Sequence, residues 1–290
     1  MLKANLHTHT LYSDGLLTAV ELYKLAKDNG IDILSITDHD TIEHIPKEIE
    51  LAKNEKVDFL IGCEVSAYQN RKDYHILAYN FDPGDDDLIK YFENYKIERL
   101  KRAEGITHRF NALKMDLKID DILKESKNAP IGRTHIARAV VNAGLAKDTR
   151  EVFSKYLYDN GPAYIPKPYT SCKEIINLIH HSGGIAVLAH PSNFYSVKEL
   201  ENIKKDGIDG IEVIHPLHST QLQKFFRNFA RKYNLIETGG SDFHGSEYDY
   251  VNFPSYYTDE NAVEKIIEKT KIIRSKSIFK HIRPKLFSFF

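Results

Sequence analysis

Residues 5–15 read NLHTHTLYSDG, and the spacing of their histidines guides the interpretation of the rest of the chain. They overlap the strand candidate LKANLHTH at residues 2–9. His7 and His9 are two residues apart, so an extended chain directs both side chains to the same face. Asp14 comes in the loop that follows. The stretch therefore predicts a strand whose carboxyl end carries several groups able to bind a metal ion.

Outward from this stretch, short runs rich in Ile and Val alternate with helical patterns. Capping boxes predict helix starts at Thr18 with Glu21, at Ser171 with Glu174 and at Ser196 with Glu199. Repeated strand–helix units predict an α/β fold with parallel strands. A count of about seven strands favours a TIM-like barrel over an open sheet. The other strand candidates are IDILSITD (31–38), VDFLIGCEV (57–65), DYHILAYNF (73–81), GIAVLAH (184–190), GIEVIH (210–215) and NLIETGGSD (234–242).

The alternation is interrupted by a helical stretch, which predicts an insertion that caps one end of the barrel. Its expected helices cover residues 85–115, 119–127, 134–143 and 149–158. The predicted divisions are a first barrel part at 1–83, the helical insertion at 84–170, a second barrel part at 171–270 and a tail at 271–290. The tail carries six Lys and Arg residues and no acidic one. It could lie on a membrane or RNA, but packing through its own Phe and Ile residues is the favoured interpretation.

Composition gives little sign of a particular partner. The chain has 290 residues, a formal net charge of −1 and 28% charged residues, so no global field attracts nucleic acid or membranes. No secretory signal or membrane-spanning stretch is predicted, and we expect no stable membrane insertion. Two cysteines, Cys63 and Cys172, make no disulfide framework. These features favour the cytoplasm.

Further potential metal ligands occur at or near the ends of the other strand candidates. Carboxylates brought together in this number would repel one another, and buried charge is costly. Divalent cations resolve that conflict, because imidazole and carboxylate groups are ligands of Zn, Mn and Fe. A single strand histidine is more often a hydrogen-bonded core residue, but that explanation is weak for a set spread over several strand ends. The full set of predicted ligands is His7, His9, Asp14, His39, Glu64, His75, His190, Asp242 and His244.

The motifs HTHTLYSDG, ITDHD, GCEVS, AHPS and GGSDFHG resemble those of the PHP family, named for polymerase and histidinol phosphatase. The resemblance implies a distorted (β/α)₇ barrel with three metal ions at its carboxyl mouth. The insertion motifs IGRTHIARAVV and DNGPAYIPK resemble the branch that acts on nucleoside 3′,5′-bisphosphates and trims short RNA from the 5′ end. The implied substrate is a phosphorylated nucleotide or a short single-stranded oligonucleotide.

The family resemblance also implies how the ligands divide among three Mn, Zn or Fe ions. His7, His9, Glu64 and Asp242 would hold the first ion. Glu64 would bridge to a second ion, completed by His75 and His190. Asp14, His39 and His244 would hold the third. Asp14, His39, Glu64 and His244 are therefore the predicted catalytic residues, because such ions activate water and offset charge on the phosphoryl group.

Substrate contacts are predicted from the insertion and from one further histidine. Arg133 and His135 would grip a second phosphate, since guanidinium forks suit phosphate oxygens. The alternative for Arg133 is an ordinary salt bridge on a helix. His215 is a candidate for a supporting or proton-transfer role, with a structural histidine as the equal alternative. Lys167 fits a solvated loop lysine better than a phosphate ligand.

Asp38 beside His39 could orient a ligand imidazole. Two other functions remain open: a phosphatase for another small monoester such as histidinol phosphate, and a metal-stabilised accessory module without activity.

Overall fold

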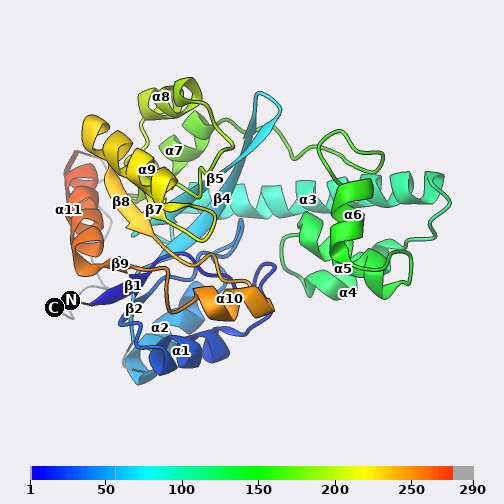
Figure 1. Ribbon diagram of the computed structural model, residues 1–290, viewed down its shortest axis with the longest axis horizontal. Helices are drawn as coiled ribbons and strands as arrows, with labels where there is room; N and C mark the ends of the chain where they lie inside the picture. The colour runs from blue at the N-terminus through cyan, green and yellow to red at the C-terminus, as the bar shows by residue number, and fades with distance from the viewer. Residues whose placement is uncertain (1, 56, 277–290) are drawn as a thin grey trace.

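The computed structural model describes residues 2–55 and 57–276. A body of strands and helices lies on one side, and a helical arm extends from it (Figure 1). The tail predicted at 271–290 is described only as far as residue 276, so the expected packing of its Phe residues lies outside the described residues. No helix in the two described ranges is both long and apolar enough to cross a membrane.

The strands form two sheets. The first has the order β3–β2–β1–β9, and β1 runs parallel to β2 and antiparallel to β9. The second has the order β4–β5–β6–β7–β8. The first sheet consists of β1 (Lys3–Asn5), β2 (Ile33–Leu34), β3 (Asp58–Phe59) and β9 (Thr258–Asp259). The second consists of β4 (Gly62–Gln69), β5 (Lys72–Tyr79), β6 (Ile185–Leu188), β7 (Gly210–Ile214) and β8 (Ile236–Gly239).

The predicted parallel arrangement is wrong at the β4–β5–β6 end of the second sheet. There β4 and β5 form an antiparallel hairpin, and β5 is also antiparallel to β6. Asn70 and Arg71 form the two-residue turn, with φ of 51° and 61°. Positive φ at both turn residues matches the right-handed twist of the strands and favours a hairpin.

The predicted α/β class is confirmed. A closed barrel is not, because the strands divide between two sheets. Individual main-chain hydrogen bonds connect the sheets beyond the regular ladders. Leu6 N donates to Gly239 O at 3.2 Å, and Glu64 N donates to Thr37 O at 3.1 Å. These bonds bring the ends of strands from both sheets to one mouth.

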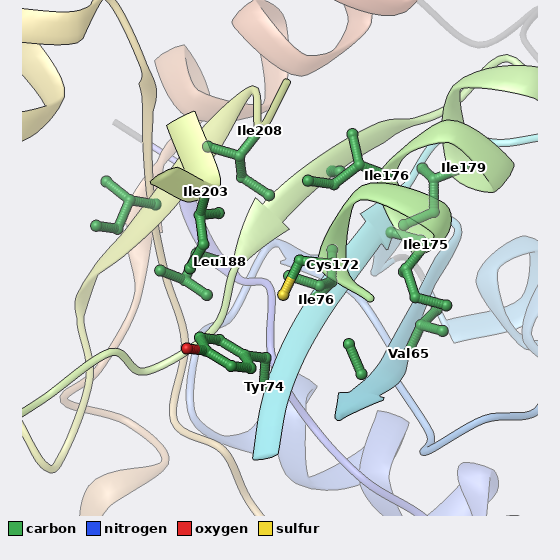
Figure 2. Packing of buried hydrophobic residues seen from close by; sticks show 14 of the residues in the cluster. Val65, Tyr74, Ile76, Cys172, Ile175, Ile176, Ile179, Leu188, Ile203 and Ile208 are labelled. Atoms are coloured by element: carbon green, nitrogen blue, oxygen red, sulfur yellow. The ribbon is translucent and has the colours of Figure 1, made fainter. Parts of the chain in front are cut away.

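Helices cover the outer faces of the body. The three capping boxes are confirmed at Thr18, Ser171 and Ser196, where each hydroxyl accepts from the main chain of the predicted Glu. Figure 2 shows α7, through Ile175, Ile176 and Ile179, packed on the second sheet. The body helices are α1 (Ala19–Asp28), α2 (Ile45–Glu55), α7 (Cys172–His181), α8 (Val197–Asp206), α9 (Thr220–Tyr233), α10 (Glu247–Asn252) and α11 (Glu260–Lys276).

All four helices predicted for the insertion are confirmed, as α3 (Asp86–Ala112), α4 (Ile119–Ser126), α5 (Arg133–Asn142) and α6 (Thr149–Lys155). The long helix α3 leaves the body and reaches the other three (Figure 1). Its start contributes Leu88 and Phe92 to the core of the body, whereas Ile106 and Phe110 join a separate apolar cluster of the insertion. One helix thus connects two cores.

Candidate active site

Glu64, on β4 and fully buried, is the centre of the polar cluster. Its Oε2 lies 3.2 Å from Nε2 of His7, 3.3 Å from Nε2 of His9 and 3.1 Å from Nδ1 of His39. The ladder of β1 ends at Asn5, so His7 and His9 follow the strand rather than lie within it. Both imidazoles still reach the same carboxylate oxygen, as their spacing predicts.

The other oxygen of Glu64 faces the second sheet. Its Oε1 lies 2.8 Å from Nδ1 of His75 and 3.0 Å from Nε2 of His190. One carboxylate therefore contacts imidazoles on both sides. This is the geometry expected of a group shared between two ion sites.

Two aspartates extend the cluster. Asp242 Oδ1 lies 3.1 Å from Nε2 of His9 and 3.3 Å from Nε2 of His7. Asp14 Oδ1 lies 3.3 Å from Nε2 of His244 and 3.9 Å from Nε2 of His39. The structure thus brings all nine predicted ligands into one connected cluster.

The donor atoms are close enough to surround metal ions. One group, with its atoms within 4.8 Å of one another, combines His7, His9, Glu64 and Asp242. Others combine His9, Asp14, His39 and His244, or His39, Glu64 and His75. Asp14 Oδ1 and His39 Nδ1 are buried and make no hydrogen bond within the described part of the chain. Unsatisfied buried donors and acceptors of this kind fit a cation as their missing partner.

Electrostatics keep the carboxylates charged. Burial would raise the pKa of Glu64, but the imidazoles of His39, His75 and His7 outweigh it and hold that pKa well below its ordinary value. Asp14 shows the same pattern, with His244 lowering its pKa against the effect of burial. Burial lowers the pKa of His39 to about 3, so its imidazole is neutral, as a metal ligand must be.

The backbone around the cluster is tightly constrained. A Cβ at Gly240 would lie 2.5 Å from His7 N, and one at Gly15 would lie 2.5 Å from His9 O. Only glycine permits these approaches. His190 and Asp242 have φ of 23° and 51°, in the left-handed region. Such conformations are costly for residues other than glycine and are often found at functional sites.

Glu212 on β7 was not recognised from the sequence. It is fully buried, its Oε1 lies 3.1 Å from Nδ1 of His7, and its Oε2 accepts from His190 N at 2.7 Å. It therefore orients His7 from the side opposite Glu64. The available signal was a single acidic residue inside the apolar strand GIEVIH.

His215 and Asp38 support the cluster differently. The buried His215 places Nε2 3.3 Å from Oδ2 of Asp242, and its Nδ1 accepts from Leu217 N. Asp38 reaches the predicted ligand His9 only through Ser13, whose Oγ lies 3.5 Å from Nδ1 of His9. Asp38 Oδ1 accepts from Thr10 N at 2.7 Å and from Ser13 Oγ at 2.5 Å. Asp38 thus organises the loop that carries Asp14.

A cavity of about 340 Å³ adjoins the cluster. Arg133 lies on its wall and donates to Asp73 Oδ2 and Asp159 Oδ1, both at 3.2 Å. The salt bridges that were the alternative for Arg133 are therefore present, at a position that also faces the cavity. The residues that line the cavity are Lys72, Asp73, His75, Arg133, Asp159, His190, Phe194 and Tyr195.

Two insertion residues differ from their predictions. Lys167 is not a solvated lysine: its side chain is 9% exposed, and Nζ lies 3.1 Å from His75 Nε2. Burial lowers its pKa to about 8. His135 does not line the cavity, and both its ring nitrogens have main-chain partners, Gly132 N and Ser13 O. This geometry contradicts the predicted grip of His135 on a phosphate.

Imidazoles and carboxylates gathered at converging strand ends are the arrangement of a metal-dependent hydrolase. The PHP domain model matches residues 5–206. The chain is 32% identical to a 3′,5′-nucleoside bisphosphate phosphatase from Chromobacterium violaceum, over 84% of this chain and 88% of the relative. It is 30% identical to the 5′-3′ exoribonuclease Rnm of Escherichia coli, over 83% and 84% respectively.

A solved structure from Bifidobacterium adolescentis, proposed to be a metal-dependent phosphoesterase, superposes with a TM-score of 0.82 at 30% identity. The match covers 92% of this chain and 96% of that one. The chain belongs to the PHP family. Its predicted reaction class, metal-dependent hydrolysis of phosphate esters, is confirmed at this level.

Proposed function

We propose that this enzyme removes phosphate from nucleoside 3′,5′-bisphosphates and releases mononucleotides from the 5′ end of short single-stranded oligonucleotides. The observation that carries the proposal is the cavity beside the cluster, where cationic Arg133 faces the same space as His75 and His190. A scissile phosphate at the histidines would place a second phosphate in the cavity that Arg133 lines. The names of the two relatives above support the same substrate class.

The nine ligands are proposed to hold three divalent ions, in the sets that the family resemblance implies. Mn, Zn and Fe all suit imidazole and carboxylate donors. When bound, such ions lower the pKa of water toward neutrality and offset charge on phosphoryl oxygens. Asp14, His39, Glu64 and His244 are the proposed catalytic residues, since they would hold ions that activate water and offset charge on the phosphoryl group. Glu212 and His215 would fix the orientation of His7 and Asp242.

Arg133 can exchange one of its present partners for a phosphate. Its pair with Asp159 is exposed, since the Asp159 side chain is 66% accessible, and exposed ion pairs contribute little stability. A planar guanidinium offers paired donors that match phosphate oxygens. Lys167, buried beside His75, is a second basic side chain that the insertion contributes to this region.

The domain organisation follows from this assignment. We infer that residues 1–83 and 171–270 carry the metal site and that 84–170 cap it, supplying Arg133 and Lys167. The two sheets would be the halves of a distorted (β/α)₇ barrel, connected by the hydrogen bonds between them. Cys63 and Cys172 are free and buried, in keeping with a reducing cytoplasm.

The test compares adenosine 3′,5′-bisphosphate, AMP, histidinol phosphate and a 5′-phosphorylated short RNA, each with Mn²⁺. We expect the bisphosphate to be preferred over AMP, and the RNA to be shortened stepwise. Arg133→Ala should lower kcat/KM for the bisphosphate by roughly 10- to 100-fold, the value of a hydrogen bond to a charged group. The loss for AMP should be much smaller.

Arg227→Ala is the matched control, because Arg227 pairs with Glu237 outside this cavity. Arg227→Ala should leave kcat/KM unchanged for both the bisphosphate and AMP. A preference for histidinol phosphate would overturn the nucleotide assignment and keep the metal site. Bound metal without turnover of any of the four would favour the accessory module.

A further inference from the structure

The GRTHIAR motif at the start of α5 contacts the loop that carries Asp14. Nε2 of His135 lies 2.9 Å from the carbonyl oxygen of Ser13. Nη2 of Arg138 donates to the carbonyl oxygen of Asp14 at 2.9 Å. Two side chains from one turn of an insertion helix therefore hold two consecutive carbonyls of the body.

The His135 contact has a defined direction. Gly132 N donates to Nδ1 of His135 at 3.1 Å, so Nδ1 provides its lone pair and Nε2 carries the proton. That proton faces Ser13 O, and the residue is 2% exposed. Arg138 is three residues further along and lies on the same face of the helix. Gly132 thus fixes the ring of His135, and His135 and Arg138 together hold the loop at Ser13 and Asp14.

The same loop is held from the body. Ser13 Oγ donates to Asp38 Oδ1 at 2.5 Å, and Gly15 N donates to Thr10 O at 3.0 Å. The carbonyl of Asp14 lies between these two anchors and is held by Arg138. The Asp14 carboxylate, 3.3 Å from His244, therefore takes its position from both the body and the insertion.

We propose that His135 and Arg138 are positioning residues, which hold the Asp14 main chain so that its carboxylate can share a metal ion with His39 and His244. The inference rests on the proposed function, because it assumes that this third ion site exists. The helical insertion then has two tasks: it lines the substrate cavity, and it completes one ion site without supplying a ligand. Partners of this kind typically change metal affinity when they are removed.

The experiment measures Mn²⁺ binding to the full-length protein after chelator treatment, by calorimetric titration and by metal content after desalting. Arg138→Ala and His135→Gln should each weaken one of the three sites by roughly 10- to 100-fold. The other two sites should be unchanged. Arg138→Lys should recover part of the lost affinity, because lysine can still donate to the carbonyl.

The matched control is Arg109→Ala. Arg109 also donates from an insertion helix to a main-chain carbonyl, at 2.6 Å, but its acceptor is Tyr164 within the insertion. Its thermal unfolding without metal should change about as much as that of Arg138→Ala, while all three Mn²⁺ sites persist. Equal weakening of all three sites by both substitutions would overturn the proposal, since it would indicate general destabilisation.

Asp14→Asn separates the proposal from its premise. If Asp14→Asn loses one Mn²⁺ but Arg138→Ala binds three with the affinity of the unmodified protein, the positioning role is wrong and the ion site stands. If Asp14→Asn binds Mn²⁺ like the unmodified protein, the ion assignment of Asp14 fails and the positioning role fails with it. Should His135→Gln not fold, the Arg138 pair of variants still decides.

Discussion

The strand ends of the body and the helices of the insertion organise buried polar groups in opposite ways. At the strand ends, carboxylates and imidazoles contact one another, and atoms such as Asp14 Oδ1 lack hydrogen bonds among the described residues. In the insertion, Arg102 and Arg109 donate to the carbonyls of Ile165 and Tyr164. The unpartnered atoms at the strand ends fit cations, whereas these two guanidinium groups already have partners within the insertion. The comparison separates groups that are proposed to bind ions from groups that hold the insertion together.

The most severe test of this contrast is Glu64→Gln, which keeps the shape of the central side chain and removes its charge. Because both oxygens of Glu64 face imidazoles, the substitution affects two proposed ion sites at once. We expect kcat to fall by roughly 10⁴-fold or more, as for other residues that act as a unit. Steady-state kinetics with saturating Mn²⁺ measures it. A loss under tenfold would show that Glu64 is not the shared ligand.

The next largest effect should come from the contact between the two regions, the buried pair of Asp40 and Arg99. Arg99 also donates to Ile131 O at 2.9 Å, so it connects the body to the insertion. Asp40→Asn tolerates the φ of 52° but leaves the guanidinium without its charge partner. Breaking one side of a buried pair costs about 3–5 kcal/mol, which denaturant unfolding would detect.

A double-mutant cycle checks the Asp40–Arg99 assignment. Arg99→Met removes the stranded charge, so Asp40→Asn combined with Arg99→Met should be less destabilised than the two single losses added together. Simple additivity would show that the pair does not couple the regions.

Glu212→Gln tests whether an orienting group in the body matters as much as the ligands it supports. Gln retains an acceptor for one of its two partners, His7 Nδ1 and His190 N, but not the charge. Mn²⁺ affinity should weaken by roughly 10- to 100-fold, with the fold unchanged by circular dichroism. If Glu212→Gln binds Mn²⁺ with the affinity of the unmodified protein, Glu212 does not orient the metal ligands.

The smallest effect concerns Glu48, a buried carboxylate outside the cluster. Burial, with Asp38 nearby, raises its pKa well above the ordinary value. The folded state therefore disfavours the ionised form of Glu48. The stability that the neutral carboxyl contributes is present below about pH 4.3, the pKa in the unfolded chain, and is lost as the pH rises above it. Without metal, Glu48→Gln should be more stable by at least about 1 kcal/mol at pH 8, the value of one pKa unit.

The comparison of pH values supplies the control for Glu48→Gln. The difference in unfolding free energy between Glu48→Gln and the unmodified protein should shrink toward pH 4, because residue 48 then becomes uncharged in both proteins. A difference that does not depend on pH would contradict the raised pKa. Chemical unfolding at pH 5 and pH 8 measures it.

Local sequence patterns were sufficient for the features that depend on neighbours in the chain. The four helices of the insertion and the capping boxes were predicted, because apolar spacing and caps act within a few residues. The identity of the cluster was also predictable. Most of the potential ligands lie at or just past the end of a strand pattern, and the carboxyl ends of parallel strands converge at one mouth. His75 is an exception, because it lies within the pattern at 73–81.

The tertiary structure decided what depends on residues far apart in the chain. The burial of Lys167 beside His75 and the contact between Glu212 and His7 arise from the way the insertion and β7 pack, which no local pattern encodes. The β4–β5 pair is antiparallel, against the predicted parallel arrangement, because a two-residue turn at Asn70 and Arg71 joins the strands. His135 was assigned to substrate from its motif, yet it bonds to Ser13, 122 residues away. The sequence by itself determined which chemical groups are present and in what order; only packing determined which of them meet, since hydrogen bonds and ion pairs depend on distance in space.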